Sequence, residues 1–386
     1  MANLTNKGIS RGLIGVRESA LVNEQAFTSS GTWRKPHNNG LFTYMFCLGG
    51  GGGGSSGGAW AVRTAGGGGS AGGADLQMFL TATLPDSLDV TVGAGGSGGV
   101  KTAGNDTVGV FGGQGGVSKI SSGTLAGGDL TTYAQGDAGR GAGQGTNYSF
   151  GGQTHNRGMF ASQVVYQGST NYYTGFGAGG HGYYGNAGIA GSIGQAGGGG
   201  GGAAYYWGTG TMSGAGGRGS VFFHGIRVPT NNTPNAPLSF AGGLRPPYQS
   251  NATLGGYSHP VYGNNRSYFA PEDGARAATN TSQGYVFFTY GGGGGALGFA
   301  ASQDGGNGTD REFGGDGGGG GVGIAYANSS NPTRGGHGGN GGFPAGGGGG
   351  GGSYVTSTNS SNSWTAGNGG NGAAGKVWIW TVGVQL

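Results

Sequence analysis

The sequence predicts a mainly irregular and β fold, in which short β-strands frame packed polyglycine II helices. This would be a glycine-rich sandwich of two modules with very little α-helix. Three observations predict it. Glycine makes up 107 of the 386 residues, against about 7% in average proteins, and each glycine destabilises a helix interior by roughly 1 kcal/mol relative to alanine. Glycine also recurs locally at every third position. Aromatic residues make up 11%, which indicates an ordered chain and not a flexible linker.

The three-residue period is clearest in glycine triplets such as GGHGGNGGF at residues 335–343. Three residues per turn is the repeat of the polyproline II helix, which makes no hydrogen bonds within itself. Glycine lets backbones approach closely, and buried N–H and C=O groups need partners. We therefore expect neighbouring glycine helices to bond to one another. The third residue of each triplet should point outward or toward a layer edge, as at Ser97, Gln114, His337 and Asn340.

Composition excludes several other classes. Collagen needs far more proline than the 11 residues here, and the unbroken glycine runs break its period. Only 8% of residues are charged, the net charge is +4 and the cations are scattered, which argues against nucleic-acid binding. The single cysteine, Cys47, lies in an apolar run and is expected to be buried. The first residues lack the apolar core of a signal peptide, so we expect synthesis and folding in a cytoplasm.

Four regions follow one another along the chain. Residues 1–25 contain little glycine, fit a short helix or an extended arm, and are the expected attachment segment. Residues 26–228 form the first glycine-rich module, with aromatic loops. Residues 229–283 hold seven of the eleven prolines and much asparagine, which indicates a connector or an inserted loop region. Residues 284–386 form the second glycine-rich module.

Both modules show the same plan of strand, glycine-rich middle and strand. The first opens with LFTYMFCL before polyglycine at residues 41–54 and closes with GRGSVFFHGIRV at 217–228. The second opens with GYVFFTY before polyglycine at 284–295 and closes with AAGKVWIWTVGV at 373–384. This repetition predicts a duplicated architecture.

Three stretches carry a resemblance to a known family: AFTSSGTWRKP at 26–36, LDVTVGAGGSGG at 88–99 and GAAGKVWIW at 372–380. They resemble a recurrent glycine-rich domain of bacteriophage tail fibres. The polyglycine blocks separated by Tyr/Asn/Ser-rich loops are similar to the tip adhesin of T-even-like phages. The resemblance implies a scaffold of packed polyglycine II helices whose loops contact a host receptor. The two modules and the proline-rich connector depart from the adhesin pattern.

Composition independently favours loops as the recognition surface, because Tyr, Ser, Gly and Asn are the residues preferred in binding loops. The loop at 159–176 and the stretch at 203–212 have this composition. Any single aromatic could instead cap the glycine lattice. The candidate receptor-binding residues are Tyr166, Tyr172, Tyr173, Phe176, Tyr183, Tyr184, Tyr205, Tyr206 and Trp207. Weaker candidates are Tyr326, Tyr354 and Trp364, and the connector tyrosines, Tyr248, Tyr257, Tyr262 and Tyr268, form a separate candidate surface.

Signals for catalysis or metal binding are weak. GxSxG and GxGxxG matches arise by chance in so glycine-rich a chain, and the six histidines are far apart in sequence. We therefore expect neither an enzyme nor a cofactor. One weak candidate calcium site consists of Asp304, Asp310 and Asp316 in the stretch QDGGNGTDREFGGDG. Carboxylates in a glycine-rich turn can bind Ca²⁺. A solvated loop is the default interpretation of that stretch.

The leading hypothesis is a non-enzymatic virion protein, a phage fibre or fibre-tip adhesin that binds a host bacterial surface receptor. It would lie on the virion surface and join other fibre or tail proteins through its N-terminal segment. The alternative is a purely structural fibre-shaft or minor capsid component. Ice binding and glycan depolymerisation are less favoured. The sequence does not decide between a homotrimer and a monomer. Phage fibres are commonly trimers, whereas an intramolecular lattice needs one chain only.

Overall fold

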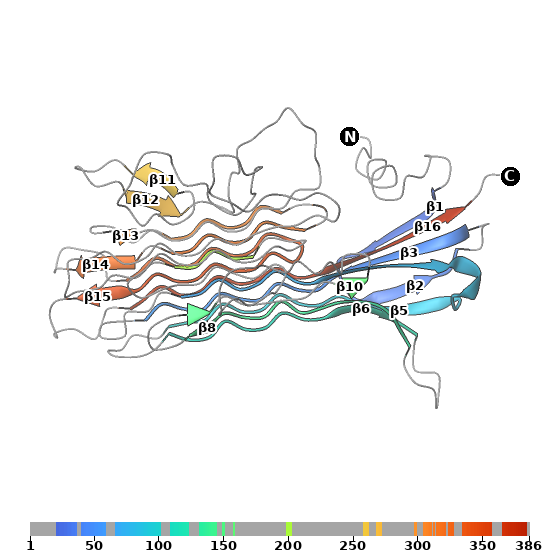
Figure 1. Ribbon diagram of the computed structural model, residues 1–386, viewed down its shortest axis with the longest axis horizontal. Helices are drawn as coiled ribbons and strands as arrows, with labels where there is room; N and C mark the ends of the chain where they lie inside the picture. Colours follow the sequence, from blue (N-terminus) through green and yellow to red (C-terminus); the bar gives the residue numbers. More distant parts are fainter. Residues whose placement is uncertain are drawn as a thin grey trace, which may run out of the picture.

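The structure is a computed structural model that combines β-sheets at one end with a bundle of long glycine segments (Figure 1). The residues that it describes are 21–36, 40–58, 66–101, 109–122, 131–144, 149–150, 157–158, 198–202, 258–261, 268–271, 297–298, 304–310, 312, 314–321, 323–327, 334–356 and 365–383. Within these, the helical residues are a single 3-10 turn, η2 (Thr81–Thr83). The predicted mainly β and irregular fold is confirmed.

A five-stranded sheet forms the centre of the sheet end. Its strands, in spatial order, are β1 (Leu21–Phe27), β16 (Lys376–Gly383), β3 (Gly40–Leu48), β4 (Ala74–Leu80) and β10 (Arg157–Gly158). The pairs from β1 to β4 are antiparallel, and β10 pairs with β4 in parallel. The predicted strands at 41–48 and 373–384 are thus β3 and β16, side by side at the middle of one sheet. Residues 21–25 of the predicted attachment segment belong to β1.

A second, four-stranded antiparallel sheet packs on one face of the first. Its strands are β2 (Gly31–Arg34), β5 (Ser87–Thr91), β6 (Ser118–Ser121) and β7 (Thr132–Gly136). The core between the two sheets includes Trp33, Met45, Leu88, Ile120 and Ile379, all at most 1% exposed. Alternation along each strand sends every second side chain into this core.

The other face of the five-stranded sheet buries a row of aromatic rings. Phe46 stacks on Trp378 with centroids 5.1 Å apart, and Trp378 lies 6.5 Å from Trp380. The Lys376 ammonium lies 4.5 Å from the Trp378 ring centroid. β3 and β16 are therefore buried on both faces, which explains their nearly unbroken apolar sequences. Cys47 is fully buried as expected, and this burial raises the pKa of its thiol.

The glycine segments continue directly from the strands and bond to one another as the three-residue period predicts. The backbone N–H groups from Gly49 to Gly57 donate in strict rotation to three neighbours, the segments 66–73, 109–117 and 366–375. The rotation repeats after every third residue. Three residues per turn is the geometry of the polyproline II helix, so the glycine runs form hydrogen-bonded polyglycine II segments.

Two of these segments are enclosed on all sides. The carbonyl groups of segment 49–58 accept N–H groups from three further segments, 93–101, 137–142 and 345–353. Segment 49–58 thus has six bonded neighbours, the number that surrounds each rod in hexagonal packing. Segment 345–353 is enclosed in the same way.

The hydrogen bonds place the described glycine segments in three layers. The first layer holds 304–310, 335–342, 366–375 and 93–101; the second holds 314–321, 345–353, 49–58 and 109–117; the third holds 198–202, 66–73 and 137–142. The sandwich that the sequence predicts is therefore three layers deep over these residues.

The residues between the layers are small because there is no room for more. At most glycines of the enclosed segments an added Cβ would overlap a neighbouring backbone carbonyl. Two of the buried exceptions in segment 49–58 are serines that use their hydroxyl oxygens as acceptors. Ser55 Oγ accepts from Gly67 N at 2.8 Å, and Ser56 Oγ accepts from Val110 N at 2.7 Å. Outward triplet positions behave as predicted: Ser97, Gln114 and Asn340 are exposed, whereas His337 is half-buried.

The two predicted modules share this lattice. Gly348 N donates to Gly52 O at 3.0 Å, and Gly54 N donates to Gly370 O at 2.9 Å. The second module's closing strand, β16, also pairs with the first module's opening strand, β3. The predicted strands at 217–228 and 284–290 lie outside the described residues. The module boundaries stay a prediction from sequence.

The remaining described strands are short. They are β8 (Gly143–Gln144) paired with β9 (Ser149–Phe150), β11 (Ser258–Val261) paired with β12 (Tyr268–Pro271), and a parallel sheet of β13 (Leu297–Gly298), β14 (Gly323–Ala327) and β15 (Tyr354–Thr356). Strands β11 and β12 are the described part of the predicted connector. No described helix is long and apolar enough to cross a membrane.

Candidate functional site

The lattice has two different ends. β3 leads into segment 49–58 and β5 leads into 93–101, so these segments start at the sheets and finish at the far side. We call that far side the distal end; it holds Gly58, Lys101 and Ser353. Strands β13, β14 and β15 lie there, opposite β1, β16 and β3 (Figure 1).

One outer face of the lattice carries a ladder of polar side chains. We call it the asparagine face. It is the outer surface of the first layer, and its residues are Asp304, Asn307, Asp310, His337, Asn340, Asn368 and Asn371. Each is a third-position residue of a triplet, so the sequence period brings them all to the same side.

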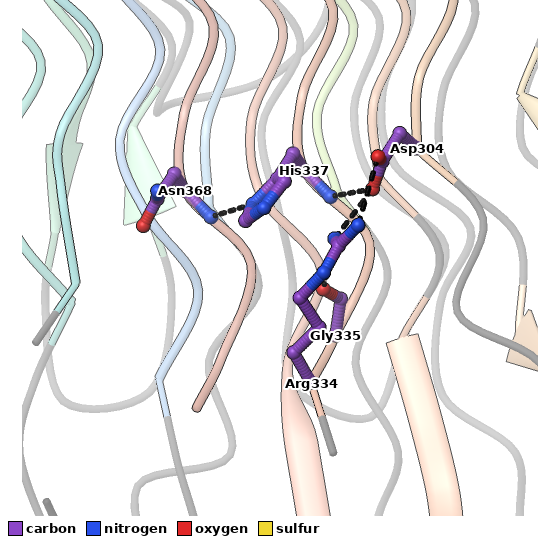
Figure 2. Close-up of polar contacts among 5 residues, drawn as sticks. All are labelled: Asp304, Arg334, Gly335, His337 and Asn368. Carbon is purple, nitrogen blue, oxygen red and sulfur yellow. Dashed lines mark hydrogen bonds and ion pairs between the residues drawn. The ribbon is translucent and has the colours of Figure 1, made fainter. Parts of the chain in front are cut away.

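The first row of the ladder crosses the face near the distal end. Asp304 Oδ1 accepts from the backbone N of His337 at 2.7 Å, and His337 Nδ1 accepts from the backbone N of Asn368 at 2.8 Å (Figure 2). Asn368 Oδ1 accepts from the backbone N of Lys101 at 2.8 Å. One side chain on each segment thus satisfies an N–H of the next segment, where the lattice offers no further backbone carbonyl.

The second row lies one turn closer to the sheets and repeats the pattern with asparagine throughout. Asn307 Oδ1 accepts from Asn340 N, and Asn340 Oδ1 accepts from Asn371 N, both at 2.8 Å. Asn371 Oδ1 accepts from Gly98 N at 2.7 Å. A third row begins with Asp310 Oδ1, which accepts from Phe343 N at 2.7 Å.

These contacts determine which way each side chain faces. A backbone N–H can only donate, so the asparagine atom facing it must be the oxygen and the amide nitrogen must face away. By the same argument, His337 Nδ1 carries no proton and Nε2–H is the imidazole donor. Arg334 holds the Asp304 carboxylate with two hydrogen bonds, of 2.6 and 3.0 Å (Figure 2). Such a bidentate pair is strongly directional.

The electrostatics follow from this arrangement. Burial lowers the pKa of His337 below its ordinary value of 6.5, the Arg334 guanidinium lowers it further, and Asp304 partly opposes them. Partial burial alone would raise the pKa of Asp304. The hydrogen bonds from Arg334 and the His337 N–H, with the charge of the Arg334 guanidinium, instead bring the pKa of Asp304 below its ordinary value. The first row is therefore stable as a neutral imidazole beside a paired carboxylate.

We expect His337 to make the free energy of unfolding depend on pH. The folded pKa is below the unfolded value of 6.5, so the unfolded state binds more protons as pH falls through about 6.5, and stability is lost there. His337→Asn keeps an acceptor of the Asn340 type but removes the titration. Urea unfolding at pH 7.5 and pH 5.5 should show a smaller loss of stability for His337→Asn than for the natural chain. Equal losses would contradict the assigned tautomer.

The aspartates of the candidate calcium site are part of the glycine lattice in the structure. Asp304 and Asp310 each accept a backbone N–H, and Asp316 is buried within segment 314–321. In the part of the chain that the structure describes, no three His, Cys, Asp or Glu residues gather closely enough to hold a metal ion.

All nine candidate receptor-binding residues lie outside the described residues: Tyr166, Tyr172, Tyr173, Phe176, Tyr183, Tyr184, Tyr205, Tyr206 and Trp207. Of the weaker candidates, Tyr326 lies in β14, and Tyr354, in β15, is 1% exposed. Burial raises the pKa of its hydroxyl to about 12. Its side chain is therefore not available to a receptor in this conformation.

Sequence reasoning found the outward positions of His337 and Asn340 but missed their partners. Arg334, Asn307, Asn368 and Lys101 were not singled out as site residues. One signal was present: Asp304, Asn307 and Asp310 repeat at three-residue intervals, like the third positions of the 335–343 triplets. Nothing in that spacing says which two segments are neighbours.

A family model described as a glycine-rich domain matches residues 26–225, more than half of the 386-residue chain. The match includes β2 to β7 and segments 49–58, 66–73 and 93–101. No curated protein matches the chain.

Proposed function

The chain belongs to the glycine-rich domain family, and from its architecture we propose that it is a bacteriophage fibre or fibre-tip adhesin. In this proposal it lies on the virion surface and binds a receptor on the host bacterium, a protein or a glycan of the outer membrane. Tyr/Asn/Ser-rich loops on the polyglycine II scaffold make the contact. The protein is not an enzyme, needs no cofactor and does not bind nucleic acid.

The observation that supports this proposal best is the polarity of the lattice. β1 and β16, near the two ends of the chain, pair with each other at the sheet end. The stretches 59–65, 102–108 and 357–364 connect neighbouring segments whose described ends lie at the distal end. One end is thus suited to attachment and the other to presenting several loops together. Rigid scaffolds that position loops are a common arrangement for binding.

The composition of two connections, 328–333 and 357–364, fits a recognition surface. Residues 328–333 read NSSNPT and residues 357–364 read STNSSNSW, which is the adaptable polar composition of binding loops. Segment 198–202 runs antiparallel to 66–73, so its last residue, Gly202, lies at the distal end, and Tyr205, Tyr206 and Trp207 follow it in the sequence. The candidates at 166–184 follow β10, which pairs with β4 at the sheets.

Attachment to the virion would use residues 1–25, whose last five residues enter β1. The segment therefore joins the rest of the fold at the sheet end, opposite the distal end. Other fibre or tail proteins are the partners that this proposal requires. The proposal is compatible with two assemblies, which are a homotrimer and a monomer attached to a separate shaft.

Loop replacement tests the proposal. Residues 203–212 and 357–364 are replaced, separately and together, by Gly/Ser sequences of equal length. We expect adsorption of phage carrying the double replacement to fall at least tenfold, because the contacting side chains are removed while the scaffold stays intact. The matched control replaces residues 123–130, which join β6 to β7 at the sheet end, and should leave adsorption unchanged.

The alternative is a purely structural virion component without receptor contact. It predicts unchanged adsorption after replacement of every distal connection and of 159–176, with normal virion assembly. Binding of the purified protein to host envelopes separates the two functions directly. Retention on envelopes that the double replacement abolishes supports the adhesin.

A further inference from the structure

The asparagine face presents an array of hydrogen-bond donors that the fold itself does not use. The oxygen of each asparagine side chain accepts a lattice N–H. Among the described residues, the Nδ2 groups of Asn307, Asn340, Asn368 and Asn371 and the Nε2–H of His337 donate to no protein atom. Asn307, Asn340 and Asn371 are exposed, so their amide groups face solvent with their orientation already set.

The lattice beneath makes this array rigid. The side chains lie on adjacent backbones bonded at 2.7–2.9 Å; for example, Gly341 N donates to Asn371 O at 2.8 Å. Each side chain is also anchored at its oxygen. A ligand that binds such a face does not have to freeze loose rotamers, which otherwise costs about 0.5–1.5 kcal/mol per side chain. Several weak hydrogen bonds can therefore add up to measurable affinity.

The charges on the face select the kind of ligand. Asp304 and Asp310 are exposed at its edge, and Arg334 compensates only Asp304. Carboxylates at the edge disfavour phosphate and other polyanions. Hydroxyl groups, by contrast, both accept from amide N–H donors and donate to a carboxylate. A chain of neutral hydroxylated rings can accept hydrogen bonds from the amide groups of this face and donate hydrogen bonds to its carboxylates.

We propose that the asparagine face binds a neutral polysaccharide. The chain lies across the segments, from 304–310 toward 93–101. Its hydroxyl oxygens accept from the Nδ2 groups of the second row and from His337 Nε2–H in the first row. A hydroxyl hydrogen donates to Asp310 at the edge. The two rows are three residues apart, about 9 Å at the polyproline II rise of ~3.1 Å per residue, so neighbouring stretches of one glycan can occupy both.

This site differs from the loops of the proposed function in place and in residues. It lies on the side of the lattice, and its side chains belong to the glycine segments. Soluble glycan binding therefore does not depend on loops 203–212 and 357–364. A failure of the adhesin proposal leaves the glycan site testable, and a failure of the glycan site leaves the adhesin proposal testable.

The test replaces donors while keeping the lattice contacts. In Asn307→Asp/Asn340→Asp/Asn371→Asp each carboxylate oxygen can still accept the backbone N–H, but the outward amide donor becomes an acceptor. The matched control, Ala94→Asp/Ser97→Asp/Gln114→Glu, adds the same charge at exposed third positions elsewhere on the lattice. The single variant Asn340→Asp serves if adjacent carboxylates in the triple variant reduce folding.

Binding is measured by calorimetry with mannan, dextran and galactan, and with heparin as an anionic comparison. We expect at least one neutral polymer to bind the full chain, the triple variant to bind it at least tenfold more weakly, and the control to bind as the natural chain does. The proposal is overturned if none of the three neutral polymers binds, if heparin binds more tightly than all of them, or if the control loses as much affinity as the triple variant.

Discussion

Gly53→Ala is expected to prevent stable folding of the protein. An added Cβ at this position would overlap the carbonyl of Ser97 and lie within 2.9 Å of Gly98 N. Segment 49–58 has bonded neighbours on every side, so neither backbone can move without breaking hydrogen bonds to a third. Strain of this kind belongs to the exceptional class of substitutions, and we expect a loss of about 4 kcal/mol or more.

Thermal unfolding followed by circular dichroism measures the effect, and Gly31→Ala is the matched control. At Gly31 an added Cβ would meet only the Phe27 ring at 3.6 Å, an ordinary van der Waals distance. The control should melt close to the natural chain, whereas Gly53→Ala should melt far lower or accumulate as insoluble protein. Equal melting temperatures would show that the lattice can dilate, and would contradict the packing described here.

The second large effect is expected for Trp378→Ala. Trp378 is 1% exposed and stacks on Phe46 with a centroid distance of 5.1 Å. Removing a buried tryptophan side chain from a packed core loses about 3–5 kcal/mol. Lys376 also loses the aromatic ring over which its ammonium lies. Since β16 lies between β1 and β3, the variant should weaken both sides of the five-stranded sheet.

Phe111→Ala provides the comparison for that substitution. It removes an aromatic side chain that is 64% exposed, and exposed substitutions usually change stability by less than about 0.5 kcal/mol. Denaturant unfolding of the two variants should therefore separate them clearly. A small loss for Trp378→Ala would mean that the aromatic row contributes little to the stability of the sheet.

Much of the architecture could be predicted because it depends on local sequence. The apolar run that leads into polyglycine at 41–54 predicted β3, and the apolar run that follows a glycine-rich stretch at 373–384 predicted β16. The three-residue period predicted hydrogen-bonded segments with outward third positions, and Ser97 and Asn340 confirm it. These features need only backbone preference and the alternation of side chains.

Neighbours in the lattice could not be predicted. Glycine backbones are chemically identical, so nothing in the sequence states that segment 49–58 bonds to 366–375, or that β16 pairs with β3. The asparagine face depends on those neighbours, since His337 and Asn368 come together only where their segments meet. In the sequence nothing connects His337 with the aspartates. The packing of the segments in layers brings these side chains into rows.

The rotation of N–H groups among three neighbours also constrains how such a gene can change in length. Loss of one codon within segment 49–58 would turn every following residue by a third of a turn, and each N–H would face the wrong neighbour. Loss of three codons would shift the contacts by one full turn and keep every direction. The same holds for Asn368 and Asn371, which stand three residues apart. We therefore expect insertions and deletions in these segments to be tolerated in multiples of three residues, so that the scaffold lengthens or shortens by whole turns.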